Sequence, residues 1–233
     1  MKPTHKTFKL LSIVTLAVAI GLPSALLFAD GPEQGAGAWV TGFVNAPMGS
    51  HFTFSLQLEP RFSFTDPGLD RTLIRPGVRL NLPFGLSIGG GVSWFHVFTS
   101  PASRNDEFQT WEDIQHHVQL GSLSLTNRLR LEERFLQGRD DVGLRLRYLI
   151  RGQVPVNSRG LSAVAWNELF VNTNNVSDGP SAGVDQNRTF VGANERFNDE
   201  FQVELGYMLN YTPKPSGPNQ MNHVVVITTT YNF

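Results

Sequence analysis

Two long runs of alternating residues constrain this chain more than any other feature. From Leu123 to Phe135 apolar residues recur at alternate positions with interruptions at Asn127 and Glu133, and from Val142 to Ile150 they occupy every second position. Arginine is the commonest residue between them. Successive side chains of a β-strand point to opposite faces, so a period of two over ten or more residues predicts a strand with one apolar and one polar face. The sequence here therefore predicts a hairpin of two long strands.

The same rhythm extends over most of the chain, and no segment after residue 35 has a helical period. Eleven strands are predicted, at residues 37–45, 51–64, 70–82, 86–98, 107–120, 123–135, 142–154, 161–171, 185–197, 201–211 and 222–233. Turn-forming residues separate them, and no linker or tandem repeat divides the chain. We therefore expect one all-β domain.

The first residues have a different character. Lys2, Lys6 and Lys9 precede an apolar stretch from Leu10 to Leu22, and small residues lead to Ala29. A basic start, a short apolar stretch and a small residue at the cleavage point are typical of a secretory signal peptide. We predict a signal peptide at residues 1–29 and a mature β-domain at residues 30–233. A membrane anchor is the alternative, but the apolar stretch is short for a spanning helix.

Alternation does not by itself show whether the apolar face contacts lipid or a protein core, because a soluble β-sandwich would bury the apolar face in its interior. Three features favour a transmembrane barrel. The strands are long enough for a tilted bilayer crossing. Their polar faces contain arginine, which suits enclosed ion pairs, and Lys214 is the only lysine after residue 29. Aromatic residues occur near strand ends, as in the interfacial girdles of outer-membrane barrels, at Trp94, Phe98, Phe135, Tyr211, Tyr231 and Phe233.

The expected fold is an antiparallel up-and-down β-barrel of 10–12 strands in the bacterial outer membrane. Single-chain bacterial barrels have an even number of strands. We therefore expect that residues 30–38 supply a twelfth strand, or that the first short strand lies outside the wall and leaves ten. The ending at Tyr231 and Phe233 resembles the signal read by the barrel-assembly machinery, so this machinery and outer-membrane lipid are the expected partners. Counting back from a periplasmic C-terminus places the longer connections outside the cell.

Turn positions predict which charged residues are neighbours inside the barrel. A two-residue turn at Gly121–Ser122 pairs Asp113 with Arg130. A turn centred on Gly138–Arg139 pairs Arg130 with Arg147 and Glu132 with Arg145. A turn at Asn157–Ser158 would place Arg147 opposite Glu168. Adjacent cross-strand side chains interact directly, so two arginines side by side need acidic neighbours. The other expected members of this lumen network are Glu59, Arg61, Arg75, Arg79, Arg188 and Glu204.

Three functions are compatible with such a lumen. Paired side chains can fill a narrow barrel and leave a structural protein. An arginine-rich open lumen would be porin-like and conduct a small anionic solute. A lipid-modifying enzyme, similar to outer-membrane phospholipases or lipid A deacylases, would need a base such as His223, next to Asn222, at the outer end of the last strand. Structural or weakly pore-forming activity is the leading hypothesis, and His223 is the weak catalytic candidate.

No cofactor or metal site is expected. The neighbours His116 and His117 point to opposite faces of one strand and cannot share a metal ion. The sequence contains no cysteine. A net charge of −1 gives no indication of nucleic-acid binding.

The order of short motifs resembles an uncharacterised bacterial barrel family catalogued as domain of unknown function 2490. The resemblance extends over nearly the whole mature chain. It rests on Trp39, Leu58–Arg61, Arg75–Gly77, Arg128–Glu132, Arg145–Tyr148, Val154–Pro155, Asn167–Phe170, Asp185–Arg188, Glu204–Tyr207 and Asn222–His223. It implies the barrel fold and the outer-membrane location, and it implies no activity. It also suggests that Arg130, Glu132, Arg147, Glu168 and Arg188 act together.

Overall fold

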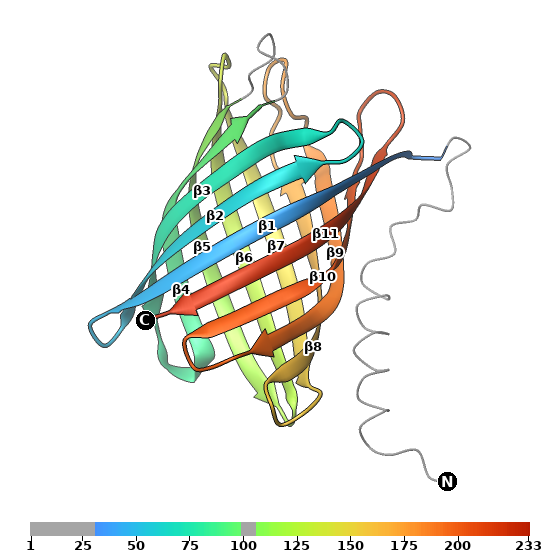
Figure 1. The fold of residues 1–233 in the computed structure, drawn as a ribbon. Helices are drawn as coiled ribbons and strands as arrows, with labels where there is room; N and C mark the ends of the chain where they lie inside the picture. The colour runs from blue at the N-terminus through green and yellow to red at the C-terminus, as the bar shows by residue number, and fades with distance from the viewer. Residues whose placement is uncertain (1–30, 99–105) are drawn as a thin grey trace.

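The protein forms a single closed β-barrel. A computed structural model describes residues 31–98 and 106–233, and it contains eleven strands whose neighbours are hydrogen-bonded all the way round (Figure 1). Among these residues, no helix is long and apolar enough to cross a membrane. The predicted signal peptide at residues 1–29 and the domain start at residue 30 lie outside the described residues.

The strands agree closely with those expected from the alternation, except that the first is longer. Their bounds are β1 Glu33–Met48, β2 Phe52–Ser63, β3 Gly68–Asn81, β4 Leu86–Val97, β5 Glu107–Leu120, β6 Leu123–Leu136, β7 Val142–Pro155, β8 Leu161–Asn172, β9 Gly183–Arg196, β10 Phe201–Thr212 and β11 Gln220–Asn232. A short 3-10 turn, Pro83–Gly85, joins β3 to β4.

The expectation of an even strand number is wrong. Strand β1 is a full member of the wall, pairing with β2 on one side and with β11 on the other, and residues 31–38 do not form a separate twelfth strand. An odd number of strands in an up-and-down barrel makes the first and last run in the same direction. The barrel accordingly closes through a parallel β1–β11 ladder from Glu33↔Gln220 to Asn45↔Asn232, and every other neighbouring pair is antiparallel.

The two faces of the wall are arranged as the alternation predicts. Outward-facing apolar side chains such as Leu58, Ile74, Ile114, Leu129 and Leu205 are exposed. All eleven buried charged side chains of the described residues face the interior. They are Glu59, Arg61, Arg75, Asp113, Arg130, Glu132, Arg134, Arg145, Arg147, Glu168 and Glu204.

The two ends of the barrel differ. The connection between β8 and β9 and the one between β10 and β11 lie at the upper end in Figure 1, whereas the C-terminus and the β1–β2 turn lie at the lower end. We call these the loop end and the turn end. This agrees with the expected division into longer and shorter connections.

Exposed and half-buried aromatic side chains occur at both ends. Trp94, Phe108 and Phe135 are in ring contact on three neighbouring strands near the loop end. Near the turn end, Tyr231 contacts Phe233, and the exposed Phe52, Phe84 and Phe197 lie at strand ends or in turns. Tyr211 was expected among the girdle residues, but it is buried.

Two large inward-facing aromatic residues are accommodated by glycines on neighbouring strands. A Cβ atom at Gly77 would lie 2.4 Å from the Trp111 ring, and one at Gly91 would lie 2.9 Å from it. A Cβ atom at Gly206 would similarly lie 2.4 Å from the ring of Phe190. The glycine-rich stretch Gly89–Gly91 therefore provides packing space inside the wall.

Candidate functional site in the barrel lumen

The predicted registers around β6 are confirmed. Asp113 pairs with Arg130, Arg130 with Arg147, and Glu132 with Arg145. The first register follows from the two-residue turn between β5 and β6, and the other two follow from the five-residue connection between β6 and β7, which is centred where the sequence predicted it.

The predicted register of Glu168 is wrong by two residues. Arg147 lies opposite Phe170, and Glu168 lies opposite Leu149, because the turn between β7 and β8 is centred on Ser158–Arg159, one residue later than predicted. The arginine side chain is long enough to compensate, and its Nη2 is 2.8 Å from a carboxylate oxygen of Glu168. Arg128 also contacts this carboxylate, at 2.7 Å.

Glu132 is the centre of the largest ion-pair cluster. Its fully buried carboxylate contacts Arg147, and it lies 2.6 Å from Arg145 and 3.5 Å from Arg75. Arg145 also reaches Asp185, at 2.7 Å. Three guanidinium groups from β3 and β7 thus converge on one carboxylate from β6, which compensates the cost of burying these charges.

Smaller clusters surround this centre. Asp113 accepts hydrogen bonds from Arg130 and Arg79, both at 2.7 Å, and Arg130 also lies over the ring of Trp111. Among the remaining predicted residues, Glu59 pairs with Arg61 at 2.6 Å and Glu204 pairs with Arg151 at 2.6 Å.

Arg188 differs from these arginines. It lies in the lumen on β9 and donates one hydrogen bond, from Nη2 to Gln186 at 2.7 Å. Among the described residues, it forms no ion pair, and its buried Nε has no hydrogen-bond partner. Its guanidinium lies over two aromatic rings, 4.8 Å from the centre of Trp39 and 4.4 Å from that of Phe170.

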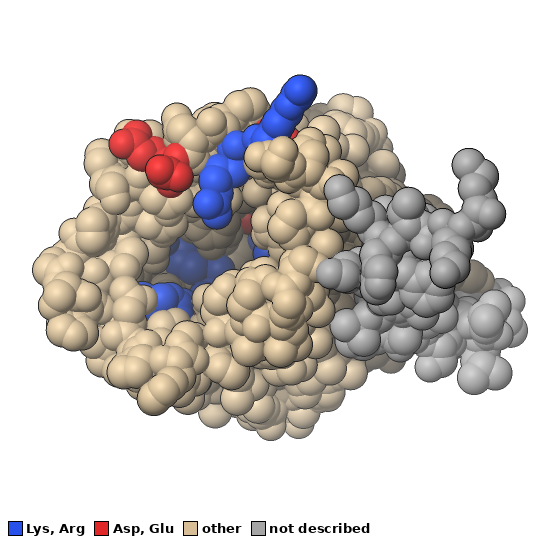
Figure 2. All heavy atoms as spheres, turned by 90° about the horizontal axis from the view of Figure 1, so that it is seen from below, with Lys and Arg blue, Asp and Glu red and all other residues tan. Residues whose placement is uncertain are grey.

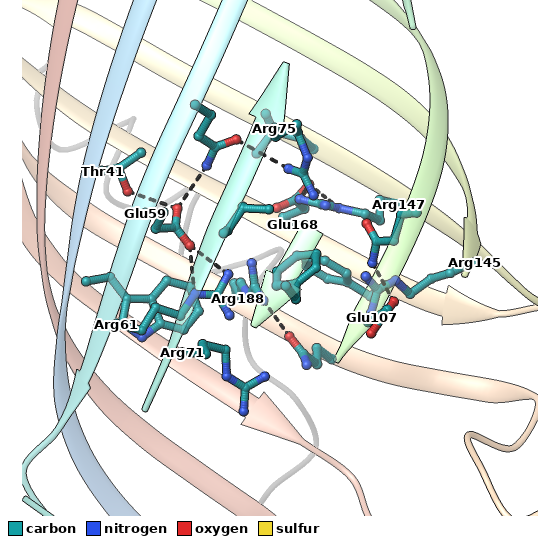
Figure 3. Close-up of a pocket in the computed structure, with 18 of the residues that line it drawn as sticks. Thr41, Glu59, Arg61, Arg71, Arg75, Glu107, Arg145, Arg147, Glu168 and Arg188 are labelled. Atoms are coloured by element: carbon teal, nitrogen blue, oxygen red, sulfur yellow. Dashed lines mark hydrogen bonds and ion pairs between the residues drawn. The ribbon is translucent and has the colours of Figure 1, made fainter. Parts of the chain in front are cut away.

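A cavity of about 680 Å³ separates these clusters. Its lining extends from Arg139 and Asp178 at the loop end to Gln202 and Thr230 near the turn end. Seen from the turn end, the molecule is hollow and basic side chains lie within the hollow (Figure 2). Figure 3 shows Arg188 between the Glu59–Arg61 pair and Arg145.

The charge of the lining is strongly positive. Ten arginines line the cavity, namely Arg61, Arg71, Arg75, Arg128, Arg134, Arg139, Arg145, Arg147, Arg151 and Arg188. Five acidic residues line it, namely Glu59, Glu107, Glu168, Asp178 and Glu204. Asp70, Glu132 and Asp185 contact lining arginines from outside this set. Two positive charges remain in excess when all three are included.

One side of the lumen is apolar, which the alternation did not predict. Val164, Phe190, Met208, Val224 and Val226 form a buried cluster on β8 to β11, and Trp39 and Trp166 pack against it. The sequence gives a weak signal for this cluster. In the stretches Val164–Trp166 and Val224–Ile227 both parities are apolar, so a period of two does not identify the inward face.

The β8–β9 connection covers part of the loop end. Its Val176 is buried, and Asp178, Gly179 and Pro180 line the cavity. The connection is fixed to the neighbouring turn by a hydrogen bond of 2.9 Å from the backbone N–H of Ser177 to Asp141. Hydrogen bonds from the hydroxyl and backbone N–H of Ser177 hold the pKa of Asp141 below its usual value.

His223 lies on the outer surface, outside the lumen. One ring nitrogen is 2.6 Å from the hydroxyl of Tyr207, and the other is 2.7 Å from the side-chain oxygen of Gln34. Among the described residues, no serine or threonine hydroxyl is bonded to the ring. Asn222 is on the opposite face of β11, so the two residues do not form one site.

Comparisons with known proteins identify similar chains. An uncharacterised protein of Methylorubrum extorquens is 27% identical over 198 residues, which is 83% of this chain and 86% of that protein. Two structures of OmpT, an outer-membrane protein of Vibrio cholerae, are more distant. The variant without loop L8 is 13% identical with a TM-score of 0.41, and the other structure is 11% identical with a TM-score of 0.40.

The matches to OmpT cover 69% and 70% of this chain, and the chain spans only 57% and 56% of those structures. The family comparison covers more. Residues 36–222 match the family described as protein of unknown function DUF2490, and the chain therefore belongs to that family.

Proposed function

We propose that this protein is an outer-membrane β-barrel that conducts small anions weakly through its lumen. The observation on which this rests is the cavity along the lumen, lined by ten arginines and five acidic residues. A water-filled passage with excess fixed positive charge concentrates anions and repels cations. Ion pairs fill much of the interior, so the expected conductance is small.

The outer surface supports the membrane location. Strands of 12 to 16 residues are long enough for a tilted bilayer crossing. Apolar side chains dominate the outward face, and exposed aromatic residues lie near both ends, where lipid headgroups would meet the barrel. Outer-membrane lipid is thus the proposed partner of this surface.

Planar bilayers test the proposed conductance. With purified barrel and a potassium chloride gradient, we expect small current steps whose reversal potential has the sign of a chloride preference. Replacing Arg188 by Glu should move the reversal potential toward cation preference. The same change at Arg159, an exposed turn residue outside the cavity lining, should have a much smaller effect. The absence of steps, or a cation preference of the unmodified barrel, would contradict the proposal.

We further propose that the exposed aromatic pair Tyr231 and Phe233 is recognised by the barrel-assembly machinery. Phe233 is 73% exposed at the turn end, beside Tyr231. Phe233→Ser is expected to lower the amount of heat-modifiable protein in outer-membrane extracts, with Phe84→Ser as the control because Phe84 is exposed in another turn at that end. Equal loss in both variants would assign the effect to the aromatic girdle alone.

The lipid-modifying alternative is not favoured. Both ring nitrogens of His223 have partners, and neither partner is an activated nucleophile. Nucleophilic catalysis needs a base within hydrogen-bond reach of the group it activates.

A further inference from the structure

Arg188 is unusual among the arginines of the cavity. Nine of the ten lining arginines have a carboxylate within ion-pair distance in the part of the chain that the structure describes, and Arg188 has none. The nearest acidic clusters are already occupied. Glu59 holds Arg61, and Glu168 holds Arg128 and Arg147. A half-buried guanidinium without a carboxylate partner retains part of its desolvation cost, and an external anion would reduce that cost.

The apolar wall of the lumen adjoins this arginine. Trp39 contacts the Arg188 guanidinium and also packs against the buried cluster that contains Met208 and Val226. Trp166, which is stacked on Phe190, is part of the same wall, and all four of Trp39, Trp166, Met208 and Val226 line the cavity. A cationic group and a hydrophobic surface therefore lie side by side within one cavity.

We infer that this part of the lumen is a binding site for a compact amphipathic organic anion. Its carboxylate or similar head pairs with Arg188, and its apolar body lies against Trp39, Trp166, Met208 and Val226. The cavity, at about 680 Å³, is within the range of small-molecule sites, which is roughly 300–1,000 Å³. An inorganic anion would pair with Arg188 but would make no contact with the apolar wall.

The closed wall indicates where the ligand comes from. Each strand is hydrogen-bonded to both neighbours, including the β1–β11 pair, so no gap between strands opens toward the bilayer. The ligand must enter from an end of the barrel and is therefore a water-soluble solute instead of a membrane lipid. The inference rests on the proposed function, in which anions enter the lumen. It adds that the lumen selects amphipathic organic anions.

Isothermal titration calorimetry of the purified full-length mature barrel in a nonionic detergent tests the site with 2-naphthoate as the probe. Heats from protein-free micelles are subtracted. We expect saturable binding at one site per barrel. The uncharged 2-naphthalenemethanol lacks the carboxylate, and acetate lacks the aromatic rings. Each should therefore bind at least about tenfold more weakly than 2-naphthoate. Equal binding of the acid and the alcohol would overturn the inference, whatever the behaviour of any variant.

Variants then locate the site. Arg188→Gln should weaken 2-naphthoate binding about tenfold or more, because a charge-assisted hydrogen bond is lost. Met208→Gln should weaken 2-naphthoate binding and leave acetate unchanged. Arg159→Gln, outside the cavity, should change neither. Unchanged affinity in Arg188→Gln would place the ligand elsewhere. Heat modifiability establishes that each variant is folded, and folding of Arg188→Gln is expected because no carboxylate loses its partner.

The two proposals fail separately. An anion-selective conductance without 2-naphthoate binding would overturn the binding site and leave the conductance intact. Binding of 2-naphthoate without anion-selective current steps would overturn the conductance and leave the binding site intact. Where both hold, 2-naphthoate should reduce the current through the parent barrel and have little effect on Arg188→Gln.

Discussion

At the scale of single residues, Glu132 best illustrates how the interior is held together. One fully buried carboxylate contacts three guanidinium groups, from Arg75, Arg145 and Arg147. Removing one partner of a buried ion pair lowers the stability by more than the net contribution of the intact pair, because the remaining charge is buried without a partner.

Glu132→Gln is therefore expected to be strongly destabilising. Breaking a buried pair costs about 3–5 kcal/mol, and water in the adjoining cavity should bring the loss to the lower end. Glu200→Gln is the control. This residue is exposed in a turn, where the loss should be about 0–1 kcal/mol. Urea unfolding of both variants in liposomes measures the difference. Similar midpoints would mean that the Glu132 cluster does not support the barrel.

The sequence predicted part of this network. Asp113–Arg130 and Glu132–Arg145 followed from the alternation and from correctly placed turn centres. Glu168 was placed opposite the wrong residue because the centre of the β7–β8 turn is not apparent from its composition. The isolation of Arg188 could not be predicted, since it depends on which carboxylates its neighbours already hold.

At the scale of strands, glycines determine where the large inward-facing aromatic residues fit. Gly206 on β10 lies under the ring of Phe190, and a Cβ atom there would be 2.4 Å both from that ring and from the backbone oxygen of Val191. Gly42 on β1 provides a contrast, because the nearest atom to a Cβ there is 3.8 Å away.

Gly206→Ala is expected to destabilise the barrel by about 1–3 kcal/mol, since the backbone and the Phe190 ring cannot both move away. Gly42→Ala should be neutral or stabilising by about 0.5 kcal/mol, because alanine loses less conformational entropy than glycine on folding. Unfolding midpoints of the two variants provide the comparison. Equal effects would show that Phe190 is not held against the glycines.

Strand positions were predictable from the sequence to within a few residues, except at β1. The expected strand 37–45 is part of a strand that extends from Glu33 to Met48. The additional residues include Gln34, Gly35 and Pro47, which give no clear alternation. They are ordered as strand by pairing with β2 and β11, which is a tertiary effect.

At the scale of the whole molecule, the closure of the barrel was the least predictable feature. The alternation identified eleven strands, but a general rule of even numbers favoured ten or twelve. The parallel β1–β11 ladder resolves the conflict, and it joins residues almost 190 positions apart. No local pattern specifies such a pairing. The inward apolar cluster on β8 to β11 was likewise hidden, because those strands are apolar on both faces.

The central claim is that the apolar face of this closed barrel meets lipid and the charged face encloses the lumen. Strand β2 tests it without removing a member of any buried ion pair, because Phe54, Leu56 and Leu58 face outward and the uncharged Thr53, Ser55 and Gln57 face inward. The chain contains no cysteine, so single cysteines at these six positions can be spin-labelled one at a time.

The measurement is the collision rate of each spin label, in proteoliposomes, with oxygen and with a water-soluble nickel complex. Oxygen concentrates in the bilayer, whereas the nickel complex stays in water. Our account predicts a period of two, with high oxygen and low nickel accessibility at positions 54, 56 and 58, and lower oxygen accessibility at positions 53, 55 and 57. High nickel accessibility at 54, 56 and 58 would contradict it, because the apolar face would then meet water.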